Sequence, residues 1–184
     1  MKNLLLILLS ACSITVYGQK YSTTTFTKLL EVEGTCYVIA EVDNRSKIED
    51  KSQSYLLFIN TSDGTTKQVV FENWGYYHDV KQIKIDELNI NSIIVSAKTI
   101  DLNGKRGIDW TDPTQLFVIS VDGKNKFLLT QKHFSVRTYA VNRHSGTVMV
   151  TGFYDLNRNG KIDESELNEI QIYDLKTLKL QHKI

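Results

Sequence analysis

The fold is decided by Gln115-Leu-Phe-Val-Ile-Ser-Val-Asp-Gly-Lys-Asn-Lys-Phe-Leu-Leu-Thr130, a stretch in the second half of the chain. Its first part is rich in β-branched and aromatic residues, which favour strands. Asp122 and Gly123 follow, and an Asp-Gly pair is a strong signal for a tight turn between antiparallel strands. The stretch therefore predicts a hairpin, with strands at about Gln115–Val121 and Lys126–Thr130.

The chain repeats this pattern at a nearly constant spacing. When Asp101 is aligned with Asp155, 54 residues further on, Leu116–Ser120 falls on Ile170–Asp174 without a gap. A fainter copy lies 60 residues upstream of the middle one, with Tyr55–Ile59 as the corresponding strand. Self-similarity at a fixed period indicates tandem copies of one structural unit.

Each copy is expected to form four short antiparallel strands. The predicted fold is therefore all-β, with three tandem four-stranded units at about residues 21–73, 76–131 and 132–184 in one domain, and a long loop between the second and third strands. The expected strands are Thr25–Val32, Cys36–Val42, Ser54–Thr61 and Lys67–Phe71; Val80–Ile85, Ile93–Ile100, Gln115–Val121 and Lys126–Thr130; Phe134–Val141, Thr147–Tyr154, Glu169–Asp174 and Leu178–His182.

The hairpin at 115–130, together with Tyr139–Val150, resembles the WD40-like β-propeller repeat of the TolB type. This resemblance implies that each unit is a propeller blade. Closed propellers have four to eight blades, so three blades do not complete a normal ring. We therefore expect either a homo-oligomer or a protein partner at the open edges of the array, or an open stack with capped edges.

The loop of the last unit carries the clearest functional signal. Asp155, Asn157, Asn159, Asp163 and Glu166 place oxygen-bearing side chains at loop positions 1, 3, 5, 9 and 12, with Gly160 at position 6. Hard cations need six to eight oxygen ligands, and this spacing turns alternate side chains inward. The stretch resembles the EF-hand calcium loop, which implies that the backbone carbonyl of Lys161 at position 7 is a further ligand of Ca2+. The flanking residues predict strands rather than helices, and the alternative is a solvated hairpin connection without a metal.

The corresponding loops of the other two units match less well. In the middle loop Asp101, Asn103, Asp109 and Asp112 could form a weak second metal site, although Lys105 stands where an oxygen ligand belongs. In the first loop Glu41, Asp43 and Glu49 are accompanied by Arg45 and Lys47, so we expect a plain strand connection without a metal.

The N-terminus resembles an export signal of a bacterial protein. Lys2 precedes the apolar run Leu4–Val16, which is too short to span a bilayer. Cleavage after Gly18 would remove residues 1–18 and leave a single domain at 19–184. Alternatively, Leu9-Ser-Ala-Cys12 resembles a lipobox, which would remove residues 1–11 and anchor Cys12 to lipid. We expect a periplasmic, secreted or outer-membrane location and no transmembrane span.

The charge balance of the chain bears on its partners, and its cysteine content bears on the state of Cys36. Without Lys2, 21 basic residues face 21 acidic ones, so the chain has no electrostatic bias towards nucleic acid. Cys36 is the one cysteine after the signal, and its strand-like surroundings predict a buried, inert thiol.

The sequence contains no recognisable catalytic motif, and we expect a non-catalytic protein. The histidines show no metal-ligand spacing, and neither a nucleophile elbow nor a phosphate loop occurs. Trp74, Tyr76 and Tyr77 could stack on a ligand such as a sugar, or pack between neighbouring units. The expected function is that of a calcium-stabilised interaction module; the alternatives are a carbohydrate-binding or adhesive module and, third, a small hydrolase.

Overall fold

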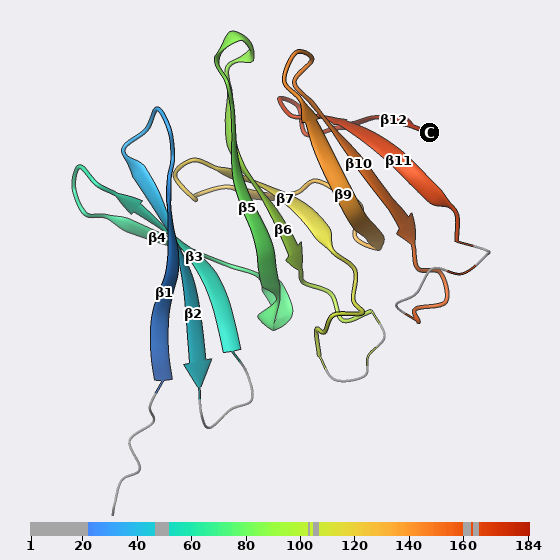
Figure 1. Ribbon diagram of the computed structural model, residues 1–184, viewed down its shortest axis with the longest axis horizontal. Coiled ribbons are helices and arrows are strands. Elements are labelled where there is room, and N and C mark those ends of the chain that lie inside the picture. Colours follow the sequence, from blue (N-terminus) through green and yellow to red (C-terminus); the bar gives the residue numbers. More distant parts are fainter. Residues whose placement is uncertain (1–21, 47–51, 103, 105–106, 160–162, 164–165) are drawn as a thin grey trace, which may run out of the picture.

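The computed structural model describes residues 22–46, 52–102, 104, 107–159, 163 and 166–184. These residues form three four-stranded antiparallel sheets, which follow one another along the chain. Figure 1 shows the sheets side by side, coloured from blue to red. The predicted fold class, three tandem units that resemble propeller blades, is confirmed.

In each sheet the strand order in space is the order in the sequence. The strands of the first sheet are β1 (Ser22–Glu31), β2 (Tyr37–Ser46), β3 (Ser52–Asn60) and β4 (Thr66–Val70). Those of the second are β5 (Tyr76–Ile85), β6 (Ile90–Lys98), β7 (Gln115–Ser120) and β8 (Lys126–Leu128). Those of the third are β9 (Phe134–Asn142), β10 (Thr147–Tyr154), β11 (Asn168–Asp174) and β12 (Leu180–Lys183). Two short 3-10 helices, η1 (Glu72–Trp74) and η2 (Asp86–Leu88), complete the described elements.

The predicted strands all form, and the largest differences are that β2 continues to Ser46 rather than ending at Val42 and that β5 begins at Tyr76 rather than at Val80. Tyr76 and Tyr77, two of the predicted stacking residues, therefore lie within β5. Adjacent side chains of a strand point to opposite faces of its sheet. Tyr76 and Tyr77 therefore belong to different surfaces.

The prediction that Cys36 is buried is wrong, because its side chain is exposed. The residue precedes β2, in the connection that follows β1. Its backbone carbonyl accepts hydrogen bonds from the N–H (2.8 Å) and the hydroxyl (2.9 Å) of Thr61, which fix the connection through the main chain. The thiol takes no part in these bonds.

Two apolar cores lie between successive sheets. The core between the first and second sheets contains Ile39, Leu56 and Phe58 from one side and Ile93, Val95 and Phe117 from the other. The core between the second and third sheets contains Ile94, Leu116 and Val118 from one side and Val148, Val150 and Tyr173 from the other. The second sheet is therefore buried on both faces, which explains why β6 and β7 contain the uninterrupted apolar runs Ile93–Val95 and Leu116–Ile119.

Polar contacts join the sheets at the margins of these cores. The amide group of Gln82 exchanges hydrogen bonds with the backbone of Glu33, at 2.8 and 3.0 Å, and so links the second sheet to the first. The hydroxyl of Tyr139 donates to Asp79 at 2.7 Å and links the third sheet to the second. These bonds fix neighbouring sheets relative to one another where the apolar contact ends.

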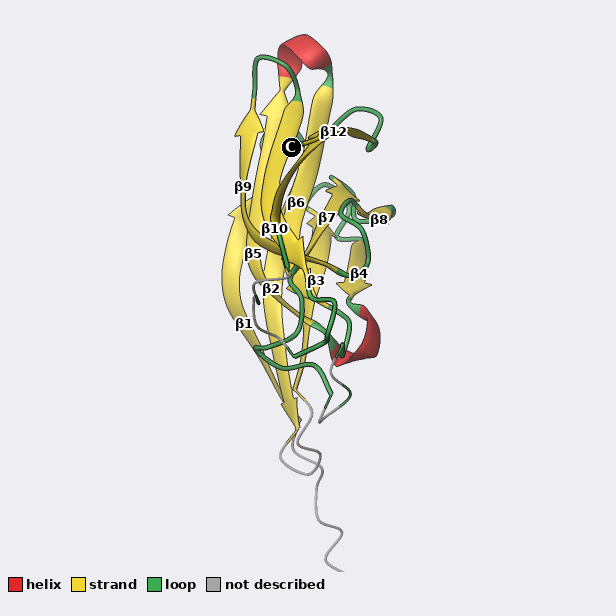
Figure 2. Cartoon of the chain, turned by 90° about the vertical axis from the view of Figure 1, so that its right-hand side faces the viewer, coloured by secondary structure: helices red, strands yellow, loops and turns green. Residues whose placement is uncertain are grey.

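Corresponding connections lie on the same side of the array. In Figure 1 the strands β2, β6 and β10 all run downward, and the connection that follows each strand starts at its lower end. Figure 2 shows the molecule from the side, with η2 at the opposite end. The connections that follow β2, β6 and β10 thus start on the same side of the array.

The predicted signal and the lipobox at Cys12 lie outside the described residues. Among the residues that the structure describes, no helix is long and apolar enough to cross a membrane.

Candidate metal site

The last loop, from Asp155 to Glu166, is closed by a buried carboxylate. Glu166 is only 3% exposed. Its Oε1 accepts a hydrogen bond from the backbone N–H of Leu156 at 2.7 Å, and its Oε2 accepts one from the N–H of Asp163 at 3.2 Å. The N–H of Glu166 in turn donates to the carbonyl of Asp163 at 2.9 Å. Position 12 of the loop is thereby tied to positions 2 and 9.

The other polar side chains of this loop turn towards one another. Asp155 is buried, and its Oδ1 accepts a hydrogen bond from the N–H of Asn159 at 3.1 Å. The side-chain amides of Asn157 and Asn159 both donate to Oδ2 of Asp163, the latter at 2.8 Å. The structure therefore brings together the five predicted side-chain ligands that it describes, whereas Lys161 lies outside the described residues.

The middle loop is closed by the same hydrogen bonds. The buried Asp112 accepts hydrogen bonds from the N–H groups of Leu102 and Asp109, each at 2.8 Å. Its own N–H donates to the carbonyl of Asp109 at 3.3 Å. Each of these residues lies 54 positions before its counterpart in the last loop. The gapless repeat read from the sequence thus extends to individual backbone hydrogen bonds.

The two loops differ in the charge that accompanies them. The ammonium group of Lys98 donates to the backbone carbonyl of Asp112, in the middle loop. Burial lowers the pKa of Lys98, and the carboxylates of Asp112 and Asp109 oppose this shift. In the second sheet Ala97 pairs with Gln115, and in the third sheet Gly152 pairs in the same way with Glu169. The residue that follows Ala97 is Lys98, whereas the residue that follows Gly152 is the uncharged Phe153. A protein cation thus accompanies the middle loop at a position where the last loop has none.

The side chains of the last loop suit a hard divalent cation better than those of the middle loop. Three carboxylate and two amide side chains belong to one hydrogen-bonded network there, and a carboxylate can accept hydrogen bonds and still offer lone pairs. In the middle loop Asp101 is engaged by the N–H groups of Gly104 (2.6 Å) and Gly107 (3.1 Å), and Asn103 lies outside the described residues. Within the described stretches, no three His, Cys, Asp or Glu side chains are grouped closely enough to hold a metal as they stand.

The first loop differs from both. Glu41 and Asp43, which align with loop positions, lie inside β2, and Asp43 accepts a hydrogen bond from the hydroxyl of Ser54 on β3 at 2.9 Å. The pairing of β2 with β3 continues to Arg45 opposite Ser52. Glu41 and Asp43 are therefore part of a strand ladder, whereas Glu49 lies outside the described residues.

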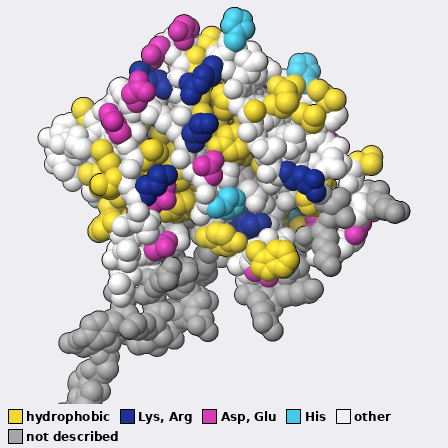
Figure 3. Space-filling view, viewed as in Figure 1, with side chains coloured by type: hydrophobic (Ala, Val, Ile, Leu, Met, Phe, Trp, Pro, Cys, Tyr) yellow, Lys and Arg dark blue, Asp and Glu magenta, His cyan; other side chains and the backbone are white. Residues whose placement is uncertain are grey.

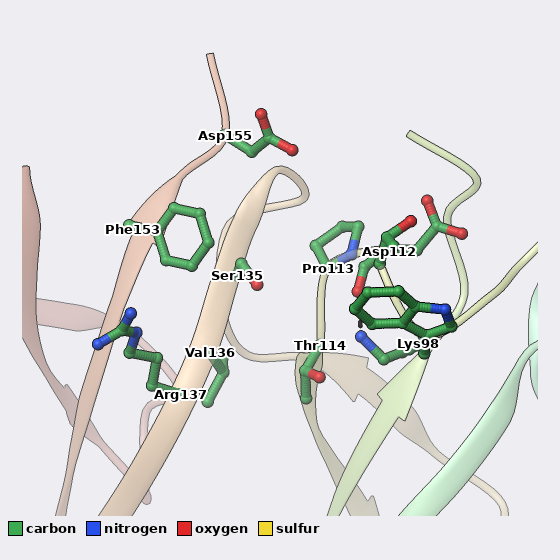
Figure 4. A pocket seen from close by; sticks show the side chains of 11 residues that line it. Lys98, Asp112, Pro113, Thr114, Ser135, Val136, Arg137, Phe153 and Asp155 are labelled. Atoms are coloured by element: carbon green, nitrogen blue, oxygen red, sulfur yellow. Dashed lines mark hydrogen bonds between the residues drawn. The ribbon is translucent and has the colours of Figure 1, made fainter. Parts of the chain in front are cut away.

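A groove of about 320 Å3 lies between the second and third sheets, next to both acidic loops. Figure 4 shows Lys98, Asp112 and Pro113 on one side and Ser135, Phe153 and Arg137 on the other, with Asp155 at one end. Trp110 also lines the groove and is 79% exposed. The guanidinium of Arg137 lies over the ring of Phe153, 5.8 Å from its centroid. Neither Lys98 nor Arg137 was identified from the sequence. Lys98 could have been found, because it ends an apolar strand directly before an acidic loop.

The predicted stacking residues do not form one patch. Tyr77 packs against Phe71, with 5.9 Å between ring centroids, at the core between the first two sheets. Tyr76 points to the other face, where burial and then the carboxylates of Asp109 and Asp112 raise its pKa. Trp74 belongs to η1, and its side chain is outside the described part. Tyr77 therefore serves the packing of neighbouring sheets.

No protein-family model matches this chain, and no curated protein matches it in sequence. The solved structures that resemble it include acylaminoacyl peptidase from Pyrococcus horikoshii, with a TM-score of 0.48 and 10% sequence identity. The match covers 88% of this chain and 25% of that chain, so this chain spans about a quarter of the length of that enzyme.

Proposed function

We propose that this protein is an exported, non-catalytic β-repeat module whose last loop binds a structural Ca2+ ion. The ligands would be the side chains of Asp155, Asn157, Asn159, Asp163 and Glu166 together with the carbonyl of Lys161. The bound ion would neutralise clustered carboxylates and stabilise the connection between β10 and β11. The rest of the molecule would act through its surfaces as an interaction scaffold.

The observation that carries the proposal is the burial of both the position-1 and the position-12 carboxylates, each of which accepts a backbone hydrogen bond from the same loop. Asp155 and Glu166 are eleven residues apart in the sequence, yet both lie against the same short segment around Leu156 and Asn159. Burying two carboxylates in one loop is costly unless they are hydrogen-bonded or neutralised. A divalent cation would supply the neutralising charge that Lys98 brings to the middle loop.

The expected affinity is modest. The site has three carboxylates, and its other ligands are neutral oxygens, whereas tight calcium sites rely on more charge and a more rigid cage. Calcium modules of extracellular proteins work at roughly 10⁻⁴–10⁻³ M. An affinity in this range would suit a protein outside the cytosol.

Thermal unfolding with and without calcium tests the proposal. Because an ion that binds only the folded state stabilises it by mass action, ~10 mM Ca2+ should raise the melting temperature. Asp155→Ala should abolish this gain, while Asp101→Ala, in the middle loop, should leave it largely intact. A parent protein whose melting temperature does not respond to Ca2+ would contradict the proposal.

Carbohydrate binding is a second candidate function, favoured by the position of Trp110. An indole ring that is largely exposed beside a polar groove offers a stacking surface, and Ser135 and Thr114 add hydroxyl groups to the lining. On the face shown in Figure 3, acidic and basic side chains are interspersed rather than separated by sign. Such a surface suits a neutral polar ligand better than a polyanion.

A glycan array tests this second function. Binding of a glycan that Trp110→Ala abolishes, and that the exposed control Phe127→Ala retains, would support it. If no glycan binds, or if both variants bind like the parent, the groove is not a sugar site.

A further inference from the structure

The two terminal sheets each carry an apolar face that no described part of the chain covers. For each sheet we call the face towards the next sheet in the sequence its forward face, and the opposite face its backward face. The cores described above bury the forward faces of the first two sheets and the backward faces of the last two. This leaves the backward face of the first sheet and the forward face of the third.

The backward face of the first sheet is apolar across all four strands. Strand pairing aligns Phe26, Val42, Tyr55 and Val70 in one row and Leu29, Ala40 and Leu57 in the next. Phe26 is 62% exposed and Leu29 is 68% exposed. Ala40 and Val42 are buried, yet they belong to neither of the two cores. A contiguous apolar patch on the surface of a protein is typical of an interface.

The strands pair across this face in the same register as across a face that already packs against another sheet of the chain. On the backward face of the second sheet, Val95 pairs with Phe117 and Ile93 with Ile119, and all four pack against the first sheet. On the first sheet, Ala40 pairs with Leu57 and Val38 with Ile59 in the same arrangement. Leu57 and Ile59 each lie 60 positions before their counterparts on β7. The exposed face is therefore built like one that binds a preceding sheet.

The forward face of the third sheet has the complementary construction. Met149 pairs with Ile172 on β10 and β11, and the neighbouring row contains Ile170. Ile170 and Ile172 correspond, 54 residues on, to Leu116 and Val118, which pack against the following sheet. Met149 is 43% exposed. This face is built like one that binds a following sheet.

We propose that a second copy of this chain covers both faces, so that two chains close a six-bladed ring. The forward face of the third sheet would pack against the backward face of the partner's first sheet, and the twofold axis would repeat the contact. The number of blades fixes the number of chains: six is the single multiple of three within the usual range of four to eight blades. The contact would repeat the packing already present between sheets within each chain.

This inference names the partner in the scaffold role proposed above, and it does not depend on the metal site. A chain that binds Ca2+ but stays a monomer would contradict the ring and leave the calcium proposal standing. A two-chain assembly that does not bind Ca2+ would contradict the calcium proposal and leave the ring standing.

Sedimentation-velocity ultracentrifugation of the purified protein tests the ring. The parent should sediment with the mass of two chains, without larger species at higher concentration. Leu29→Glu, on the first sheet, and Met149→Glu, on the third, should each give single chains with unchanged far-ultraviolet circular dichroism. Both positions are already exposed within one chain, so the fold should tolerate the charge. The matched control is Phe127→Glu on β8, whose sheet is covered on both faces within the chain, and it should remain a two-chain assembly.

Three results would overturn the ring. The first is a parent protein that sediments as a single chain. The second is a mass that grows beyond two chains with concentration, which indicates an open array. The third is dissociation by Leu29→Glu with no effect of Met149→Glu, which indicates that the first sheet binds something other than the third.

Discussion

The replacement Glu166→Ala removes the carboxylate that closes the last loop, and it should be strongly destabilising even without metal. Three backbone N–H groups, of Leu156, Asp163 and Asn157, lose a carboxylate acceptor at 2.7, 3.2 and 3.4 Å. A hydrogen bond to a charged group contributes about 1.5–3 kcal/mol. The side chain of Leu156 is exposed, so water can reach part of this segment and replace some of the loss. We therefore expect the free energy of unfolding to fall by about 2–4 kcal/mol.

The assay is thermal unfolding in EDTA, followed by circular dichroism. For a chain of this size, a loss of that order lowers the melting temperature by roughly 5–10 °C. Asp112→Ala should have a similar effect, because it removes the same bonds from the middle loop. Glu87→Ala, at an exposed carboxylate in η2, is the control and should change the stability by no more than about 0.5 kcal/mol. If Glu166→Ala behaves like Glu87→Ala, the hydrogen-bond account of the loop is refuted.

Two further predictions concern the hairpin between β7 and β8. Gly123→Ala should cost about 2–4 kcal/mol in chemical denaturation, because φ is +71° and a Cβ atom would lie 2.7 Å from the ring of Phe58. Gly64→Ala, with φ of +72° and open space, should cost only about 1 kcal/mol; equal losses would contradict the clash. The hydroxyl of Ser120 donates to Asp122 and is the main cause that lowers the pKa of Asp122 from 3.8 to about 2. Because this pKa is lower in the folded state, the stabilisation is present above pH 3.8 and is lost as the pH falls towards 2. Asp122→Asn should therefore be about 1 kcal/mol less stable than the parent at pH 6 and equally stable near pH 2, and a difference independent of pH would be inconsistent with it.

The strands could be predicted because local signals and packing agree. β-branched runs such as Leu116–Ser120 recur at a fixed spacing, and the Asp-Gly turn at Gly123 sets which strands pair. The extent of β5 could not be predicted, since Tyr76 and Tyr77 are as suitable for a packed linker as for a strand. Cys36 was misjudged for a related reason: its neighbours in the sequence are apolar, but the chain turns just before β2, and the turn leaves the thiol in solvent.

The composition of the candidate site could be predicted, but its internal bonding could not. Residue spacing identified Asp155 and Glu166 as the two ends of an oxygen-rich loop. It did not reveal that Glu166 and Asp112 accept equivalent backbone hydrogen bonds, because these depend on the loop conformation. It also did not reveal the role of Lys98, since the sequence of β6 gives no indication of how far a long side chain reaches.

The central claim is that the last loop binds calcium, and calorimetric titration of the metal-free protein with Ca2+ tests it most directly. The account predicts a saturable heat for one site per chain, with a dissociation constant of roughly 10⁻⁴–10⁻³ M. The heat should disappear in Asp155→Ala and persist in Asp101→Ala. A titration without heat of binding, together with an unchanged melting temperature, would contradict the claim and leave the loop as a hydrogen-bonded connection between strands.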